Sequence, residues 1–239
     1  MKTLIAVVGA ATVVASADAG FLGFVASARN VGANTVIDIF AGVSNASDKF
    51  LNVYDLTSNG VYVQKAGLAT KTWKPDAAGF TSTRNTSDDS FMTAGTFSGG
   101  AYGGEYYAST NTNGDPNFTG TSWNATPASA AATTIPALAG WYTGDPTSVD
   151  NTAESLAGLV GRVNATGASG ANFGIWVAHL VLAGNNKLIG TDFTFGAFAS
   201  IKDGVNGTTT QGGSSFPVPA PGALALLGVA GFASRRRRA

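Results

Sequence analysis

The side chains that could carry chemistry are few, and the single histidine is the first of them. His179 lies in an apolar run from Asn172 to Leu182, and the chain contains no cysteine. A Ser–His–Asp relay requires an exposed nucleophile beside the imidazole, and no G-x-S-x-G sequence is present. We therefore expect a buried, hydrogen-bonded structural histidine and no catalytic site. One histidine without cysteine also excludes the usual zinc and copper sites, so no metal and no cofactor is expected.

Carboxylates and oxygen-rich turns are the next candidates. A carboxylate pair for glycoside hydrolysis would have to come from residues whose separation in space the sequence does not give, namely Asp38, Asp55, Glu105 and Asp150. The stretch Asn111–Asn117 places side-chain oxygens at alternate positions, as a calcium loop does. It has a single carboxylate and lacks the glycine and glutamate of such loops, so a plain Asn/Gly/Pro turn is favoured.

Aromatic residues are the candidates for carbohydrate binding, because ring faces suit the apolar faces of sugars. The residues that could form such a stacking platform are Tyr102, Tyr106, Tyr107, Trp123 and Trp141. Packing in the core is the alternative use of most of them.

Alternating apolar and polar residues predict an all-β body of about seven or eight strands, a β-sandwich or jelly roll. The predicted strands cover residues 21–27, 35–43, 50–56, 61–65, 90–97, 172–182 and 193–201. Asn59-Gly60 and Ala183–Asn186 are predicted hairpin turns. In the run containing His179, simple alternation places the histidine on the face opposite Trp176.

The pattern fails between Ser98 and Gly158, a loop-rich stretch dominated by small and polar residues. A structureless loop of this length is uncommon in a compact domain, so we expect short strands or a folded insertion there. Residues 149–160 are predicted to include one short helix, with Asn151 as its cap and Glu154 three residues later.

Charge separates the ends of the 239-residue chain from its middle. The formal net charge is zero, but Lys2 and Arg235–Arg238 supply five of the 14 positive charges, and Asp18 supplies one of the 14 negative ones. Residues 20–216 therefore carry nine positive and 13 negative charges, a net of −4. This body is apolar enough to fold, and its faintly acidic charge disfavours nucleic acid as a partner.

The N-terminal segment has the three parts of a secretory signal peptide. Lys2 provides the basic start, residues 4–14 are apolar, and Ala17 and Ala19 provide two overlapping A-x-A cleavage options. We expect a signal helix within residues 1–19 and a mature body over residues 20–215.

The C-terminal segment, residues 216–239, combines a proline motif, a short apolar run and a basic cluster. Its defining residues are Pro219, Ala220, Pro221, Gly222, Arg235, Arg236, Arg237 and Arg238. The apolar run is shorter than the ~20 residues of a full transmembrane helix. An arginine cluster directly after it acts as a stop-transfer signal that stays cytoplasmic. The segment predicts a short hydrophobic helix that anchors the chain transiently in the inner membrane.

This tail resembles the PEP-CTERM sorting signal of bacterial exported proteins, with Ala220 where that motif has Glu. The resemblance is confined to residues 216–239. It implies handling by the export machinery, cleavage near the proline motif by an exosortase-type processing enzyme, and delivery to the cell envelope or an extracellular polysaccharide matrix.

These features together predict an exported, non-enzymatic protein of the cell surface or extracellular matrix, with a structural or adhesive role. The alternative is a carbohydrate-binding module for extracellular polysaccharide. A carboxylate-based glycoside hydrolase is the weaker alternative.

Overall fold

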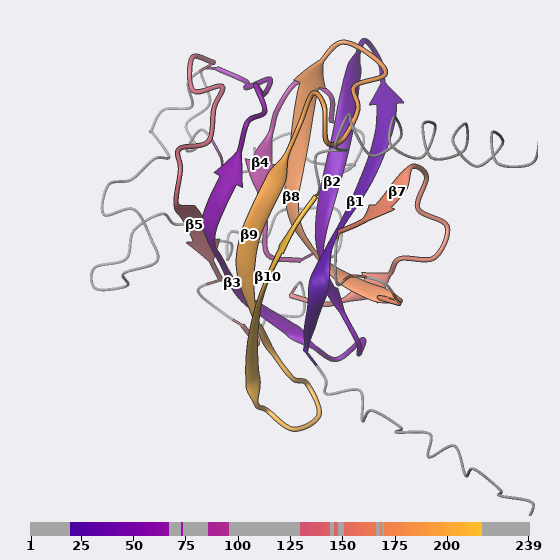
Figure 1. The fold of residues 1–239 in the computed structure, drawn as a ribbon, viewed down its shortest axis with the longest axis vertical. Helices are drawn as coiled ribbons and strands as arrows, with labels where there is room; N and C mark the ends of the chain where they lie inside the picture. The colour runs from indigo at the N-terminus through magenta and orange to yellow at the C-terminus, as the bar shows by residue number, and fades with distance from the viewer. Residues whose placement is uncertain are drawn as a thin grey trace, which may run out of the picture.

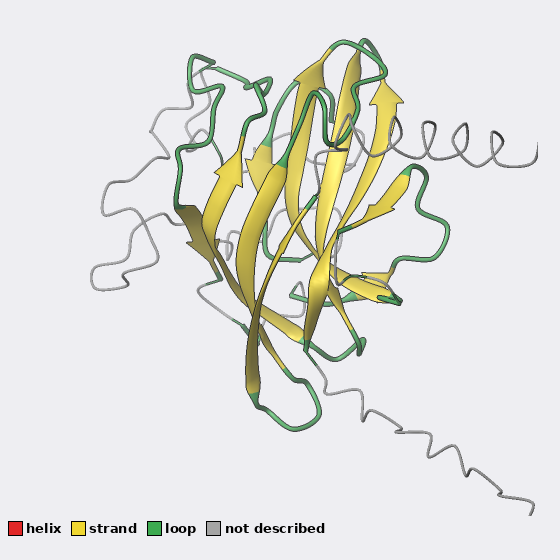
Figure 2. Cartoon of the chain, in the orientation of Figure 1, coloured by secondary structure: helices red, strands yellow, loops and turns green. Residues whose placement is uncertain are grey.

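The computed structural model describes residues 20–66, 73, 86–95, 130–143, 146–147, 151–165, 168 and 170–216. Every regular element in these ranges is a β-strand, and the strands form two antiparallel sheets that pack together (Figure 2). The all-β prediction is therefore confirmed for the described residues. They contain ten strands, more than the seven or eight expected, because several strands are only two to four residues long.

Strand pairing divides the body into a six-stranded and a four-stranded sheet (Figure 1). The order in the first is β4 (Phe91–Met92), β8 (Phe173–Ala183), β2 (Asn34–Val43), β1 (Phe21–Val31) and β7 (Arg162–Asn164), with β6 (Glu154–Ser155) also paired to β8. The order in the second is β10 (Thr209–Ser215), β9 (Phe195–Lys202), β3 (Lys49–Ser58) and β5 (Ala139–Tyr142).

The main core lies between the two sheets. In β9 the predicted alternation is confirmed, because every second side chain is buried there: Phe195, Ala197, Ala199 and Ile201. Trp73 and Trp141 are among the largest fully buried side chains of this core. Burial of such large aromatic groups is the main source of stability for a body without disulfides.

A smaller cluster covers the outer face of the six-stranded sheet. Phe40 and Trp176 project from this face and belong to one buried cluster with Leu156 and Ala171. Gly174 leaves room for this layer, since a Cβ there would lie 2.9 Å from the Leu156 side chain. Strand β8 is thus buried on both faces, as its continuous apolar run predicts.

A bulge in β8 changes the face on which its second half projects. Phe40 pairs with Trp176 and the preceding residue of β2 pairs with Ala178, so Val177 has no partner in this ladder. Val177 and Ala178 both belong to the inner core, and His179 joins Trp176 on the outer face, with ring centroids 5.9 Å apart. The face predicted for His179 by simple alternation is wrong, because a bulge inserts one residue and shifts the phase.

Both predicted hairpin turns are wrong, because the segments on either side of each turn contact different sheets. Ala183–Asn186 leads from β8 in the six-stranded sheet to β9 in the other. After Asn59-Gly60 no strand forms over residues 61–65, and Tyr62 makes only an isolated bridge to Leu182 of β8. A turn sequence specifies a change of direction but not the partner of the strand that follows.

The predicted helix in residues 149–160 is also wrong for the described part, residues 151–160. This part contains β6, and Asn151 is buried with its amide bonded to β3. Asn151 Oδ1 accepts from the Phe50 N–H at 2.8 Å, and Asn151 Nδ2 donates to the Phe50 carbonyl at 2.8 Å. The Asn151 amide therefore pairs with the backbone of β3 as a neighbouring strand would, and it does not cap a helix. Strands β5 and β6 are the short strands found in the described part of residues 98–158.

The first and last described residues are both held by the body. A Cβ on Gly20 would lie 2.5 Å from Thr210 Oγ1, which shows how closely β1 and β10 approach. Phe216 is buried, and its N–H donates to the Phe195 carbonyl at 2.9 Å. The predicted signal segment, with Ala17 and Ala19, lies outside the described residues. The same holds for the sorting segment from residue 217 and for both predicted terminal helices. Among the residues described, no helix has the length and apolarity to cross a membrane.

Phe216, the last described residue, is part of the buried core, and its truncation should show how much it contributes. The ring centroids of Phe193 and Phe195 lie 6.3 and 6.0 Å from that of Phe216. Phe216→Ala should lower the free energy of unfolding by about 3 kcal/mol, because it leaves a cavity in the core. Chemical denaturation of the purified chain measures this loss.

The matched control is Phe198→Ala, which truncates a ring on the outer face of β9. We expect that change to cost about 1 kcal/mol, since it opens no cavity between the sheets. Equal losses for the two variants would contradict the placement of Phe216 in the core.

Candidate functional site

The predicted structural histidine is confirmed, because His179 is fully buried and hydrogen-bonded at both ring nitrogens. Nδ1 lies 2.7 Å from Asp38 Oδ1, and Nε2 lies 2.9 Å from the Thr86 carbonyl oxygen. The second Asp38 oxygen accepts from Arg29 Nη1 at 2.5 Å, and Phe91 stacks on the imidazole at a centroid distance of 4.8 Å. Both ring nitrogens therefore have an oxygen partner, and no polar atom of the buried imidazole is left unpaired.

This cluster joins three strands and the segment at residue 86, and it offers no reactive group to a substrate. Burial acts to raise the pKa of Asp38, but the charges of His179 and Arg29 and their hydrogen bonds outweigh it and lower the pKa. The carboxylate therefore stays ionised and paired. Asp38 is 1% exposed, so its role in this fold is structural.

The two candidate carboxylates that the structure describes, Asp38 and Asp55, do not form the pair that glycoside hydrolysis requires. Asp38 lies on the outer face of the six-stranded sheet, whereas Asp55 lies on β3 of the other sheet, beside a bulge and with a φ of 51°. Glu105 and Asp150 lie outside the described residues, as does the oxygen-rich stretch Asn111–Asn117. Within the described ranges no group of three or more His, Asp or Glu side chains could hold a metal ion.

Trp141 is the one predicted sugar-stacking residue that the structure describes, and it is buried in the core. Its indole N–H donates to the Thr93 carbonyl at 3.1 Å. A stacking role for Trp141 is therefore wrong, because strand alternation turns this side chain inward and its neighbour Tyr142 outward. The other predicted platform residues, Tyr102, Tyr106, Tyr107 and Trp123, lie outside the described residues.

The outer face of the four-stranded sheet carries a row of cross-strand pairs, which we call the β3–β9 strip. In order along the strands, its pairs are Lys49 with Lys202, Asn52 with Ser200, and Tyr54 with Phe198. The intervening pairs face the core. The strip extends over roughly 13 Å, the length of four residues of β strand. A charged end, a polar middle and an aromatic end thus follow one another on one surface.

The aromatic end of the strip is a stacked pair. The rings of Tyr54 and Phe198 have centroids 5.5 Å apart and an interplanar angle of 23°. Phe198 is 45% exposed, and the absence of a side chain at Gly213 of β10 gives its ring space, since a Cβ there would lie 2.7 Å from it. An exposed, supported ring of this kind suits the apolar face of a sugar.

The middle of the strip has unused hydrogen-bonding capacity. Asn52 Oδ1 and Ser200 Oγ are both buried and have no hydrogen-bond partner in the structure as described. A buried polar atom without a partner costs about 1–3 kcal/mol.

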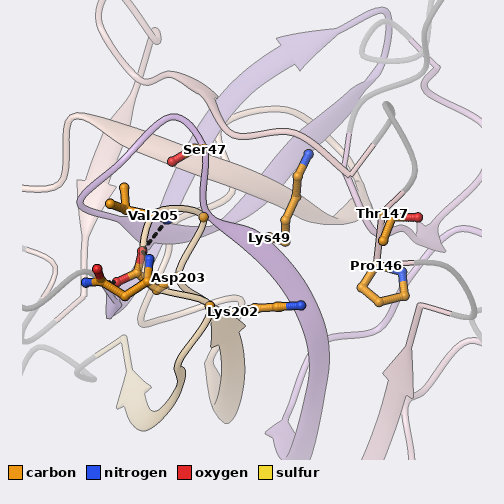
Figure 3. A pocket seen from close by; sticks show the side chains of 10 residues that line it. Ser47, Lys49, Pro146, Thr147, Lys202, Asp203 and Val205 are labelled. Carbon is orange, nitrogen blue, oxygen red and sulfur yellow. Dashed lines mark hydrogen bonds between the residues drawn. The ribbon is translucent and has the colours of Figure 1, made fainter.

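The charged end opens into a cleft of about 480 Å³ between the β9–β10 loop, residues 203–208, and Pro146–Thr147. Figure 3 shows Lys49 and Lys202 between these two segments. Neither lysine forms an ion pair or a side-chain hydrogen bond in the part of the chain that the structure describes. Two like charges directly opposite each other destabilise a sheet, so this arrangement favours an anion between them.

The acidic side chains described beside the cleft, Asp203 and Asp48, accept hydrogen bonds from backbone N–H groups. Asp203 accepts from the N–H groups of Val205 at 2.6 Å and Asn206 at 3.1 Å, and these bonds lower its pKa. Asp48 is buried, which raises its pKa, and it bonds to the backbone of both adjoining loops. Neither carboxylate is paired with the two lysines, so the positive charge of the cleft is not neutralised by them.

Sequence reasoning missed the strip, although one signal for it is present. In the alternating segment 192–201, Phe198 stands on the polar face together with Thr194 and Ser200. An aromatic residue on a polar face is a candidate for a surface role. The sequence does not indicate that Lys49 and Lys202 lie opposite each other, because the register between two strands far apart in the chain is set only by the fold.

Comparison of the chain with protein-family models, with curated proteins and with solved structures gave no match. Function is therefore inferred from the ends of the chain, from the β3–β9 strip and from the cleft.

The buried Asp38 cluster makes a prediction about stability. Asp38→Asn leaves Arg29 and His179 without their carboxylate and should lower the free energy of unfolding by about 3 kcal/mol at neutral pH. Because the folded-state pKa of Asp38 is lowered, its contribution is present above the unfolded-state pKa of about 3.9 and is lost as the pH falls through the folded value. Denaturation curves at neutral and acidic pH measure both effects.

The control is Asp88→Asn, since Asp88 is 64% exposed and lies 3.6 Å from Lys65 in a surface ion pair. That change should cost less than about 1 kcal/mol. If Asp38→Asn were equally mild, or if it left the acid sensitivity of the chain unchanged, the stabilising role of the cluster would be refuted.

Proposed function

We propose that the chain is an exported protein of the cell envelope or extracellular matrix, with a structural or adhesive role. It is sorted and cleaved through its C-terminal segment. The observation that carries the proposal is the presence, in one chain, of a signal-peptide pattern at the N-terminus and a proline–apolar–arginine segment at the C-terminus.

The partners follow from the two segments. The export machinery would cleave after Ala17 or Ala19, and an exosortase-type enzyme would act near the motif that starts at Pro219. The tail would hold the chain transiently in the inner membrane, with Arg235–Arg238 on the cytoplasmic side. The β-sandwich or jelly-roll body, with its net charge of −4, would then reach the cell envelope or the extracellular matrix.

Replacement of the four arginines tests the sorting proposal. A chain with Arg235, Arg236, Arg237 and Arg238 changed to Ser should lose its membrane-bound precursor and its C-terminal processing, because the stop-transfer charge is gone. Cell fractionation and the mass of the mature C-terminus, measured in a bacterium with a matching exosortase, give the result.

The control chain carries Lys65→Gln and Lys187→Gln, which change the charge of the body but not of the tail. It should be located and processed as the parent chain is. An unchanged location and C-terminal mass in the arginine variant would refute the sorting proposal.

A second candidate function is carbohydrate binding, and the exposed Phe198–Tyr54 stack of the β3–β9 strip favours it. The stack presents an apolar ring beside amide and hydroxyl groups, and this combination suits the alternating apolar and polar surfaces of a sugar chain. An adhesive protein in a polysaccharide matrix would use such a surface to attach.

Phe198→Ala should weaken binding of the chain to its polysaccharide by roughly tenfold, because the stacking ring is removed. Phe198→Tyr is the control, since it keeps the ring and should keep the affinity. A glycan array that contains neutral and acidic sugars provides the measurement. Equal binding by Phe198→Ala and the parent chain would exclude the strip as the binding surface.

A further inference from the structure

The lysine pair at the end of the β3–β9 strip indicates which class of polysaccharide the strip would bind. We propose that Lys49 and Lys202 hold the anionic group of an acidic polysaccharide, while a neighbouring sugar of the same chain stacks on Phe198. This inference rests on the proposed carbohydrate-binding function and adds the charge of the ligand to it.

The first argument is electrostatic. Lys49 and Lys202 are direct cross-strand partners on the outer face, so their side chains start roughly 5 Å apart. The described part of the chain offers them no ion pair, and the nearby Asp203 carboxylate is taken up by its own loop. A carboxylate or sulfate between the two ammonium groups replaces their repulsion by two charge-assisted hydrogen bonds.

The second argument is the shape of the site. Lys49 and Lys202 line the cleft, and the strip that begins at this pair carries Asn52 and Ser200 and then the exposed ring of Phe198 on the same face. The distance of roughly 13 Å between its charged and aromatic ends exceeds the width of one sugar ring. An extended chain that carries charge on some sugars and apolar ring faces on others matches this order, whereas a small free anion would use the lysines alone.

The third argument is the charge of the whole body. Residues 20–216 carry a net charge of −4, which repels polyanions at long range. A nucleic acid, with a phosphate at every nucleotide, would be repelled along its whole length. A polysaccharide whose anionic groups are spaced apart can place one of them in the cleft and neutral sugars over the rest of the strip.

Binding of the full-length chain to soluble polysaccharides, measured by isothermal titration calorimetry, tests the proposal. The probes are hyaluronate, which alternates carboxylate-bearing and neutral sugars, kappa-carrageenan, which alternates sulfate-bearing and neutral sugars, neutral dextran and duplex DNA. All chains carry Ser at positions 235–238, so that the arginine tail does not bind the polyanions. The parent should bind hyaluronate or kappa-carrageenan, and preference between them identifies a carboxylate or a sulfate as the anion.

The decisive variant is Lys49→Gln combined with Lys202→Gln. It should weaken binding to the preferred acidic polysaccharide at least about tenfold, because two charge-assisted contacts are lost. Lys65→Gln combined with Lys187→Gln changes the net charge equally and should bind as the parent does. Lys49→Arg combined with Lys202→Arg keeps both charges and should retain most of the affinity. If the double Gln variant does not fold, the single change Lys202→Gln, at an exposed position, repeats the comparison.

Each of the other possible results would overturn a stated part of the proposal. Equal weakening in both double Gln variants, or none in either, would overturn the lysine assignment while leaving carbohydrate binding in place. Equal affinity for neutral dextran would overturn the acidic specificity alone, and equal affinity for DNA would overturn the assignment to a polysaccharide. Absence of binding to any glycan, here and on the glycan array, would overturn this inference together with the carbohydrate-binding function.

Discussion

The pairing of β8 with β2, with its single bulge at Val177, is the constraint on which the rest of the body depends. β8 is buried on both faces and His179 is its one polar side chain, so a one-residue error in register would turn the imidazole into the apolar core and away from Asp38. The bulge lets consecutive residues Val177 and Ala178 fill the core and still brings His179 to Asp38. That contact is a hydrogen-bonded, fully buried pair, which forms only in one register and therefore favours it.

The outer faces of the two sheets differ in what covers them. Part of the outer face of the six-stranded sheet is covered by the cluster that contains Leu156 and Ala171. On the same face Asp38 and His179 bond to each other, and Phe91 and the Thr86 carbonyl contact the imidazole. The outer face of the four-stranded sheet instead carries exposed Phe198 and Lys202. Of the two outer faces, the one of the four-stranded sheet therefore presents an exposed aromatic and an exposed charged side chain in the described part of the body, and we expect a binding role there.

Local patterns predict the strands whose burial follows from residue type. The alternation in β9 indicates one buried face and the continuous apolar run of β8 indicates two, although the faces of the β8 residues after the bulge at Val177 are not predicted. The predictions of a hairpin turn at Ala183–Asn186 and of a helix cap at Asn151 are wrong for a common reason. In both cases the decisive partner lies far away in the chain: β9 joins the other sheet, and the Asn151 amide bonds to Phe50.

The sequence by itself determined the all-β composition of the described body and the structural character of His179, since each depends on residue type and short-range order. It also carries the two terminal patterns on which the sorting proposal rests. Only the tertiary structure decided that Trp141 points inward, that Asp38 is the partner of His179, and that Lys49 faces Lys202. These outcomes depend on register, bulges and the choice of sheet. They are fixed by burial of the whole set of apolar faces at once, and no short segment of sequence contains that information.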